Sequence, residues 1–295
     1  MELNFQVATN ISLNHILEKI EHLTFPPIRK KIKTMQLHEP FTGVWAVKDK
    51  KIVGAVLADN NHAGISEVFS FYVKPEERNN QAGCQLLSLL ETSLKNSGIH
   101  QMQARYRSDW GSLAIIEKIL KKQHWETPYL IRVIAEIDIN QYTHVPWPVI
   151  RIPSDFTLFN WSDLTDADRH EVDIITKNGE VPAEFNPLQH PDKIFLPASI
   201  GLRYKEKLIG WNIVYALKPG SIEYNNLFLR KEYRNFGHAI TLLHRSFGEQ
   251  YKLKIPQAIW IINADNKPVM KIAQRIGNDY VSKLIEVKAS YKKIV

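Results

Sequence analysis

The sequence predicts an α/β fold that occurs twice in one chain of 295 residues. The main observation is an internal repeat: a shift of 156 residues aligns Gly54 with Gly210 and Arg78 with Arg234, without a gap from about residue 44 to 109. In each copy, apolar residues first alternate with polar ones and later recur three and four positions apart. These patterns predict strands followed by helices.

A proline-rich segment separates the two copies. "NQYTHVPWPVIRIPSDF" contains Pro146, Pro148 and Pro153, which remove backbone donors and stiffen the chain. We therefore expect a boundary near residue 148, with an N-terminal domain over 1–147 and a C-terminal domain over 148–295.

The elements are expected in the same order in both copies. A helix whose start is marked by Asn, or by Ser and Asp, comes first. Two alternating strands joined by a polar turn and a third strand follow. A helix, a further strand and a last helix complete the copy. In the first copy the segments are "NISLNHILEKIEHL", "TGVWAVKDKKIVGAVLAD", "SEVFSFYVK", a helix with Leu86, Leu87, Leu90 and Leu94, and "HQMQARYR"; in the second they are "WSDLTDADRHEVDIITK", "ASIGLRYKEKLIGWNIVYAL", "IEYNNLFLR", a helix with Ile240, Leu243 and Phe247, and "QAIWIINA".

The turn between the third strand and the next helix has the features of an anion site. A sharp strand-to-helix turn presents free N–H groups and the positive end of the helix dipole. In the second copy Gly237 and the small Ala239 allow close backbone approach, and Arg234 adds a cation. The alternative is a helix start that simply packs tightly against a sheet.

Both turns resemble a motif of the GNAT superfamily of N-acyltransferases, V-x-P-x-x-R/Q-x-x-G-x-G/A. "LRKEYRNFGHAITLL" has Lys231 where the motif has proline, and "VKPEERNNQAGCQLL" has Gln81 where it has its first glycine. "NADNKPVMKIAQRIGNDY" is similar to the family's later helix through Asn266 and Gly277. The first copy has Trp110 at the Asn266 position.

The resemblance implies two GNAT-like domains, each with a mixed, mainly antiparallel sheet flanked by helices. It also implies an acyltransferase that moves an acetyl group from acetyl-CoA, as co-substrate, to an amine of a small molecule by direct attack. The first copy is expected to be partly degenerate. The implied CoA-binding residues are Phe228, Leu229, Arg234, Asn235, Phe236, Gly237, His238, Ala239 and Asn266, and a second possible CoA site contains Val73, Arg78, Gln81, Ala82 and Gly83.

The general base of such a reaction is expected on the third strand. Glu223 lies six residues before Leu229, and Glu67 six before Val73, so each shares a strand face with that apolar residue unless a bulge intervenes. By the resemblance, Glu223 is the predicted base, with Glu67 as a weaker candidate. The alternative is that each glutamate is an exposed strand residue.

The general acid is less defined. The family's usual tyrosine position is Ala273 in this sequence, which leaves Tyr280, Tyr224 or departure of the thiolate through water. Two alternatives to acetyl transfer therefore stay open: a non-catalytic acyl-CoA-binding or interaction module, and a transferase with a longer acyl donor.

Composition limits the partners. The net charge of +7 favours anionic ligands, but the basic runs are short and lack interleaved aromatic residues, so no nucleic acid is expected. With Cys84 as the single cysteine and no paired histidines, we expect neither an internal disulfide nor a metal site. No signal or membrane-spanning segment is predicted, which favours a cytoplasmic monomer or homodimer. The segment 177–195 is expected to form a loop over the site.

Overall fold

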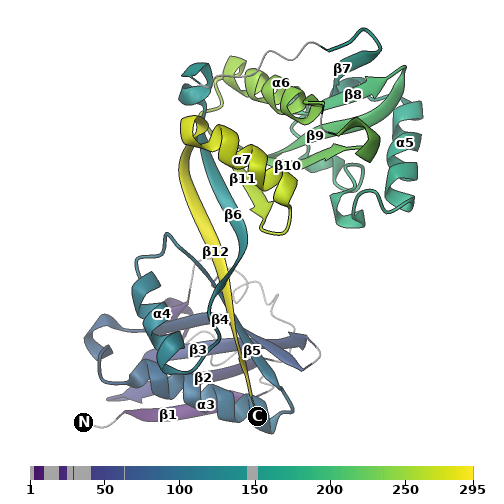
Figure 1. The fold of residues 1–295 in the computed structure, drawn as a ribbon. Coiled ribbons are helices and arrows are strands. Elements are labelled where there is room, and N and C mark those ends of the chain that lie inside the picture. The colour runs from purple at the N-terminus through teal and green to yellow at the C-terminus, as the bar shows by residue number, and fades with distance from the viewer. Residues whose placement is uncertain are drawn as a thin grey trace. The chain divides into compact units, whose positions relative to one another are not determined.

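The structure is a computed structural model that describes residues 3–9, 20–24, 29, 41–62, 64–144, 152–234 and 236–294. The side chains of residues 9, 21, 41, 61, 62, 141, 142, 144 and 275–280 are not described. The chain divides into two compact units (Figure 1). Unit 1 comprises Met1–Ile131 and Val287–Val295, and unit 2 comprises Arg132–Glu286.

The elements follow the two copies along the chain. Those from the first copy are β1 (Asn4–Thr9), β2 (Phe41–Lys48), β3 (Lys51–His62), β4 (Ile65–Val73), α3 (Ala82–Asn96), β5 (Gln101–Arg107), α4 (Leu113–Lys122) and β6 (Tyr129–Asp138). Those from the second copy are β7 (Phe156–Asn160), α5 (Asp166–Lys177), β8 (Ile200–Tyr204), β9 (Lys207–Lys218), β10 (Ser221–Leu229), α6 (His238–Lys252), β11 (Gln257–Asn263), α7 (Lys267–Tyr280) and β12 (Val281–Lys293).

The internal repeat is visible in the bounds of the elements. β3 and β9, β4 and β10, α3 and α6, and β5 and β11 are each offset by 156 residues at both ends. The sheet of unit 1 has the order β1-β2-β3-β4-β5-β12, and that of unit 2 has the order β6-β11-β10-β9-β8-β7. Among the strand pairs described, only β4 with β5 and β10 with β11 run parallel. The prediction of two copies with mainly antiparallel sheets flanked by helices is confirmed.

The last strand of each copy lies in the other unit. Residues 287–293 of β12 pair with β5 in unit 1, and residues 132–138 of β6 pair with β11 in unit 2. The structure therefore divides the chain differently from the expected domains 1–147 and 148–295, because the two copies exchange these strands. Neither strand was predicted, although Val133, Ala135 and Ile137 alternate with more exposed residues and are buried in β6.

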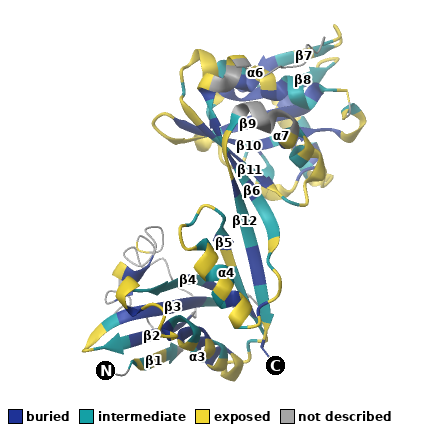
Figure 2. Ribbon diagram, turned by 60° about the vertical axis from the view of Figure 1, so that its left-hand side comes forward, coloured by how far each residue is buried: buried dark blue, intermediate teal, exposed yellow. Residues whose placement is uncertain are grey.

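α3 and α6 pack on the sheets of unit 1 and unit 2 through their buried residues. Leu86, Leu90 and Leu94 of α3 are completely buried in the core of unit 1, and Leu243 and Phe247 of α6 are completely buried in unit 2. Figure 2 shows these buried faces, with exposed residues on the opposite side of each helix. The amphipathic spacing seen in the sequence therefore places both helices on the sheet.

The helix predicted before the strands of each copy is observed in the second copy. The helix expected within 161–177 is α5, which starts at Asp166 because Thr165 forms a capping box with Asp168. The helix expected in "NISLNHILEKIEHL" falls mostly outside the described residues. The part that is described contains the short 3₁₀ turn Glu21–Leu23.

Candidate functional site

In both units two parallel neighbouring strands stop pairing halfway along their length. β10 pairs with β11 only over residues 221–224 and 257–260, although β10 continues to Leu229 and β11 to Asn263. β4 and β5 behave in the same way, with pairing limited to residues 65–68 and 101–104. Beyond these points the ladder between the two strands is broken, so the backbone N–H and C=O groups on this side of β10 and β4 are available to a bound molecule.

A bulge lies at this point of each unit and changes which side chains share a face. The register of β10 on β9 shifts between Tyr224 and Asn226, and that of β4 on β3 shifts at the equivalent position. Tyr224 packs on Phe247 of α6, and Leu229 belongs to a cluster with Leu242 of α6. Both therefore face α6.

The predicted face of the two glutamates is therefore wrong. Glu223 precedes Tyr224 and points to the opposite face of the sheet from Leu229, because the extra residue Asn225 reverses the alternation. The same bulge separates Glu67 from Val73, since Val68 and Val73 both pack in the cluster that contains α3.

The turn after β10 has the geometry expected of an anion site. Nε of Arg234 donates to the carbonyl oxygen of Leu229 at 2.8 Å, which fixes the path of the turn. Gly237 is the N-cap of α6 and has φ of 84°, in the left-handed region that glycine adopts without strain. No side chain of the described residues caps this helix start, so the first-turn amides of α6, which have no intrahelical acceptors, point out of it. Asn235 lies outside the described residues.

Phe236 and His238, on either side of Gly237, differ in exposure. The Phe236 side chain is 68% exposed, whereas His238 is 5% exposed and its ring lies 4.5 Å from that of Phe156. Burial lowers the pKa of His238 below its ordinary value, and its Nδ1 has no hydrogen-bond partner among the described residues. The histidine is therefore neutral at pH 7.

Unit 1 has the same turn with a different residue at the N-cap. Nε of Arg78 donates to the carbonyl oxygen of Val73 at 2.9 Å, as Arg234 does in unit 2. Gln81 has φ of 69°, so it takes the same left-handed conformation as Gly237. A Cβ on Gly83 would lie 3.2 Å from the ring of Phe71, which explains this glycine by packing. The missing motif glycine therefore leaves the backbone path unchanged.

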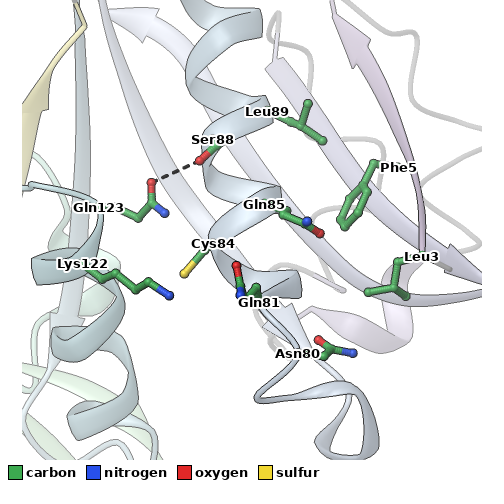
Figure 3. Close-up of a pocket in the computed structure, with 10 residues that line it drawn as sticks. All are labelled: Leu3, Phe5, Asn80, Gln81, Cys84, Gln85, Ser88, Leu89, Lys122 and Gln123. Carbon is green, nitrogen blue, oxygen red and sulfur yellow. Dashed lines mark hydrogen bonds between the residues drawn. The ribbon is translucent and has the colours of Figure 1, made fainter.

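An open groove of about 740 Å³ runs along the exposed side of α3 in unit 1. Figure 3 shows Asn80 and Gln81 at one end of it, with Cys84 and Lys122 on one side of the helix and Phe5 on the other. The ten lining residues are Leu3, Phe5, Asn80, Gln81, Cys84, Gln85, Ser88, Leu89, Lys122 and Gln123.

The surroundings of Glu223 include a tyrosine that the sequence did not single out. Tyr215 of β9 lies directly opposite Glu223 in the antiparallel register, so both side chains are on one face. Burial raises the pKa of Tyr215, and the charges of Glu223 and Asp192 raise it further. A regular hairpin that continued from the Ser221–Lys218 pair would place Ala216 opposite Glu223. The register shift between Ser221 and Ile222 brings Tyr215 there instead, so no signal in the sequence indicated this pair.

The segment 177–195 covers part of this same face. Ile194 forms a bridge to Tyr215, and Nδ2 of Asn226 donates to the carbonyl oxygen of Phe185. Nδ2 of Asn225 also donates to Oε1 of Glu223 at 3.1 Å. Glu223 and Tyr215 therefore lie on the side of the sheet that this segment lines.

The two candidate bases differ in their partners. Nη2 of Arg105 lies 3.4 Å from Oε2 of Glu67. The residue equivalent to Arg105 in the second copy is Ile261, which has no charge. Glu67 is therefore held in an ion pair, and the equivalent position beside Glu223 has no cation.

The remaining predicted residues are structural where they are described. Tyr224 is 1% exposed and donates its hydroxyl to Oε1 of Gln250 at 2.7 Å, so it is a core residue. Oδ1 of Asn266 accepts from the amide of Val269 at 3.3 Å, at the start of α7. Ala273 is buried in α7. Tyr280 is the last residue of α7, and its side chain lies outside the described part.

The described residues contain neither a metal-binding cluster nor a helix that could span a membrane. They contain no group of three or more His, Cys, Asp or Glu side chains placed to hold a metal ion. Within the same residues, every helix is too short or too polar to cross a membrane.

Comparison with known proteins gives a family match for part of the chain and a fold for its whole length. Residues 12–111 match the model of the "Acetyltransferase (GNAT) family". No curated protein matches the sequence. A tandem GNAT protein from the clavulanic acid biosynthesis pathway is similar in structure, with a TM-score of 0.61, 12% identity and coverage of 100% of this chain and 99% of the other. A GCN5-related N-acetyltransferase from Sphaerobacter thermophilus has a TM-score of 0.59, 14% identity and coverage of 98% and 96%. A GNAT-family acetyltransferase from Colwellia psychrerythraea has a TM-score of 0.58, 13% identity and coverage of 97% and 100%.

Proposed function

We propose that this chain transfers an acetyl group from acetyl-CoA to an amine of a small molecule. Two findings support this: residues 12–111 match the GNAT acetyltransferase family, and the whole chain is similar in fold to a tandem GNAT protein. The observation that carries the proposal is the turn before α6, where Gly237 takes a left-handed conformation and the first-turn amides are uncapped. Such a turn suits the pyrophosphate of CoA. The two copies form an acyltransferase that we place in the cytoplasm as a monomer or homodimer.

The residues around this turn would hold the co-substrate in defined ways. The amides of His238 and Ala239 would donate to phosphate oxygens, and Arg234, whose Nε is fixed by Leu229, would add positive charge. The backbone of Phe228 and Leu229, beyond the end of the β10–β11 ladder, would bind the pantetheine chain. We assign Phe236, exposed beside Gly237, to the same ligand.

Glu223 is the proposed base. The amine nitrogen attacks the thioester carbonyl carbon, the proton released by the nitrogen goes to the Glu223 carboxylate, and the C–S bond breaks to release the thiolate of CoA. A backbone N–H of β10 would stabilise the negative charge on the carbonyl oxygen. Tyr215, opposite Glu223, is the proposed donor of the proton that the thiolate takes up.

The acceptor would enter on the face that carries Glu223 and Tyr215. The segment 177–195 lines this face through Ile194 and Phe185, so it is placed to select the acceptor. A second candidate function is non-catalytic acyl-CoA binding, which is favoured by the buried Ala273 at the family's tyrosine position.

The test is calorimetric titration of acetyl-CoA into the wild type and into Ala239→Asp, with Ala239→Asn as the neutral control. An aspartate in the first turn favours the helix dipole but repels a pyrophosphate, so we expect binding to be lost without loss of stability. Gln81→Glu makes the equivalent test of unit 1.

Thiol release with a panel of amines then separates the two functions. Acetyl transfer predicts that the wild type consumes thioester with at least one amine and that Glu223→Gln lowers kcat by about 100-fold or more while it leaves acetyl-CoA affinity unchanged. Binding without consumption of thioester would support the non-catalytic function, and absence of binding would overturn the proposal.

A further inference from the structure

We propose that the α3 turn of unit 1 is closed to CoA by its own side chains, so that the protein binds one acetyl-CoA, at the α6 turn of unit 2. This inference rests on the proposed function, and it names the residues that make the two copies differ. The backbone alone does not distinguish them, because Gln81 and Gly237 share the left-handed conformation.

A chain of polar contacts ends on the first amide of α3. Nζ of Lys48 lies 2.8 Å from Oε1 and 3.1 Å from Oε2 of Glu77, which is buried. Nδ2 of Asn80 donates to Oε2 of Glu77 at 3.4 Å. Oδ1 of the same Asn80 accepts from the backbone N–H of Ala82 at 3.2 Å. The Asn80 amide group therefore bridges the carboxylate and the helix start.

This bridge acts on an anion in two ways. A phosphate oxygen that approaches the amide of Ala82 must first displace the Asn80 oxygen, which already accepts its hydrogen bond. The Glu77 carboxylate beside Asn80 also disfavours a second negative charge, although Lys48 offsets most of its charge. We therefore expect Asn80 to provide the larger part of the effect. Figure 3 shows Asn80 at the end of the α3 groove, beside Gln81.

The equivalent positions in unit 2 contain no carboxylate, and the one equivalent to Asn80 has no acceptor. Lys48, Glu77 and Asn80 correspond to Tyr204, Tyr233 and Phe236. The rings of Tyr204 and Tyr233 pack with their centroids 5.4 Å apart, where unit 1 has its ion pair. A phenylalanine cannot accept a hydrogen bond, so Phe236 leaves the amide of His238 to a ligand.

The experiment is calorimetric titration of acetyl-CoA into chains in which unit 2 is blocked by Ala239→Asp. In this background we expect binding below the detection limit of the titration when Asn80 is present. After Asn80→Ala we expect an affinity at least about 10-fold above that limit, the effect of one hydrogen bond to a charged group. Asn80→Asp is expected to stay closed, because it keeps the acceptor oxygen and adds a negative charge that repels the pyrophosphate. Asn80 is exposed, so both variants are expected to fold, which circular dichroism checks.

The stoichiometry of the wild type gives an independent reading. One acetyl-CoA per chain, lost in Ala239→Asp, supports the closure. Two per chain, or a site that persists in Ala239→Asp and is lost on adding Gln81→Glu, overturns it. If the wild type binds no acetyl-CoA, the proposed function fails, but Asn80→Ala still tests the closure of the α3 turn. Binding of acetyl-CoA that appears only in Asn80→Ala supports the closure. Absence of binding in Asn80→Ala as well overturns it.

Discussion

At the scale of single residues, Tyr215 decides whether the thiolate that departs in the proposed reaction has a protein donor. Burial and then the charges of Glu223 and Asp192 raise its pKa, so the hydroxyl keeps its proton at any pH below about 10. If it is the acid, Tyr215→Phe lowers kcat by about 100-fold and leaves the KM for acetyl-CoA unchanged. Steady-state kinetics with the best amine measures both constants.

Tyr224→Phe is the matched control for this substitution. Tyr224 is one strand away from Tyr215, but its hydroxyl donates to Gln250 in the core. Its loss is expected to cost about 1 kcal/mol of stability and to leave kcat unchanged. An unchanged kcat in Tyr215→Phe would instead favour departure of the thiolate through water.

The most buried ion pair described in unit 2 predicts a dependence of stability on pH. Asp168 is 1% exposed, and Nε of Arg203 donates to its Oδ1 at 2.9 Å. Burial alone would raise the pKa of Asp168, but the hydrogen bonds from Arg203 and Thr165 outweigh it and hold the pKa below its ordinary value. The pair therefore stabilises the fold above the unfolded-state pKa of about 3.9, and this contribution is lost as pH falls through the lower folded-state pKa.

Asp168→Asn leaves Arg203 without its charged partner, so urea unfolding at pH 7 should show a loss of about 3 kcal/mol. The difference from the wild type should shrink toward pH 3. Asp166→Asn, on the same helix but fully exposed, is the control and is expected to change stability by less than about 0.5 kcal/mol. A loss of equal size in both variants would contradict this assignment.

At the scale of elements, the two helix starts differ in what their N-cap residue costs. Gln81 and Gly237 both have positive φ, which costs a non-glycine residue about 1 kcal/mol. Gly237→Gln should therefore destabilise the protein by about 1 kcal/mol in urea unfolding. Gln81→Gly should change stability by less, because relief of the strain is offset by the greater freedom of glycine in the unfolded chain. A large stabilisation by Gln81→Gly would show that the offset is wrong.

The strands and helices around these starts followed from the sequence, but the side-chain directions did not. Apolar spacing was sufficient for α3 and α6, because their buried faces repeat every three or four residues over four turns. The face of Glu223 was predicted wrongly because one bulged residue, Asn225, reverses the alternation, and its sequence does not mark it. Tyr215 was missed for a related reason, since its position opposite Glu223 depends on strand register.

At the scale of the whole molecule, the repeat was visible in the sequence and the exchange of strands was not. Both copies keep the same order of elements, so a shift of 156 residues was enough to recognise them. The alternating pattern of β6 would be the same whether it paired with β5 or with β11, because both partners offer the same kind of strand edge. The sequence pattern therefore cannot tell which unit each last strand completes.

The exchange predicts how the chain behaves when it is cut between the copies. In unit 1, the C-terminal segment 287–294 contributes seven residues of β12 that pair with β5, an ion pair between Lys292 and Glu91, and the buried Ile294. Fragment 1–147 lacks all of these, and fragment 148–295 lacks the residues of β6 that pair with β11. We expect hydrogen exchange to show a loss of amide protection in β5 for fragment 1–147 alone and in β11 for fragment 148–295 alone. When the two fragments are mixed, we expect light scattering to show a 1:1 complex and hydrogen exchange to show that the protection is restored. Two fragments that fold as fully protected monomers would show that either copy can use its own last strand and that the exchange is not required for stability.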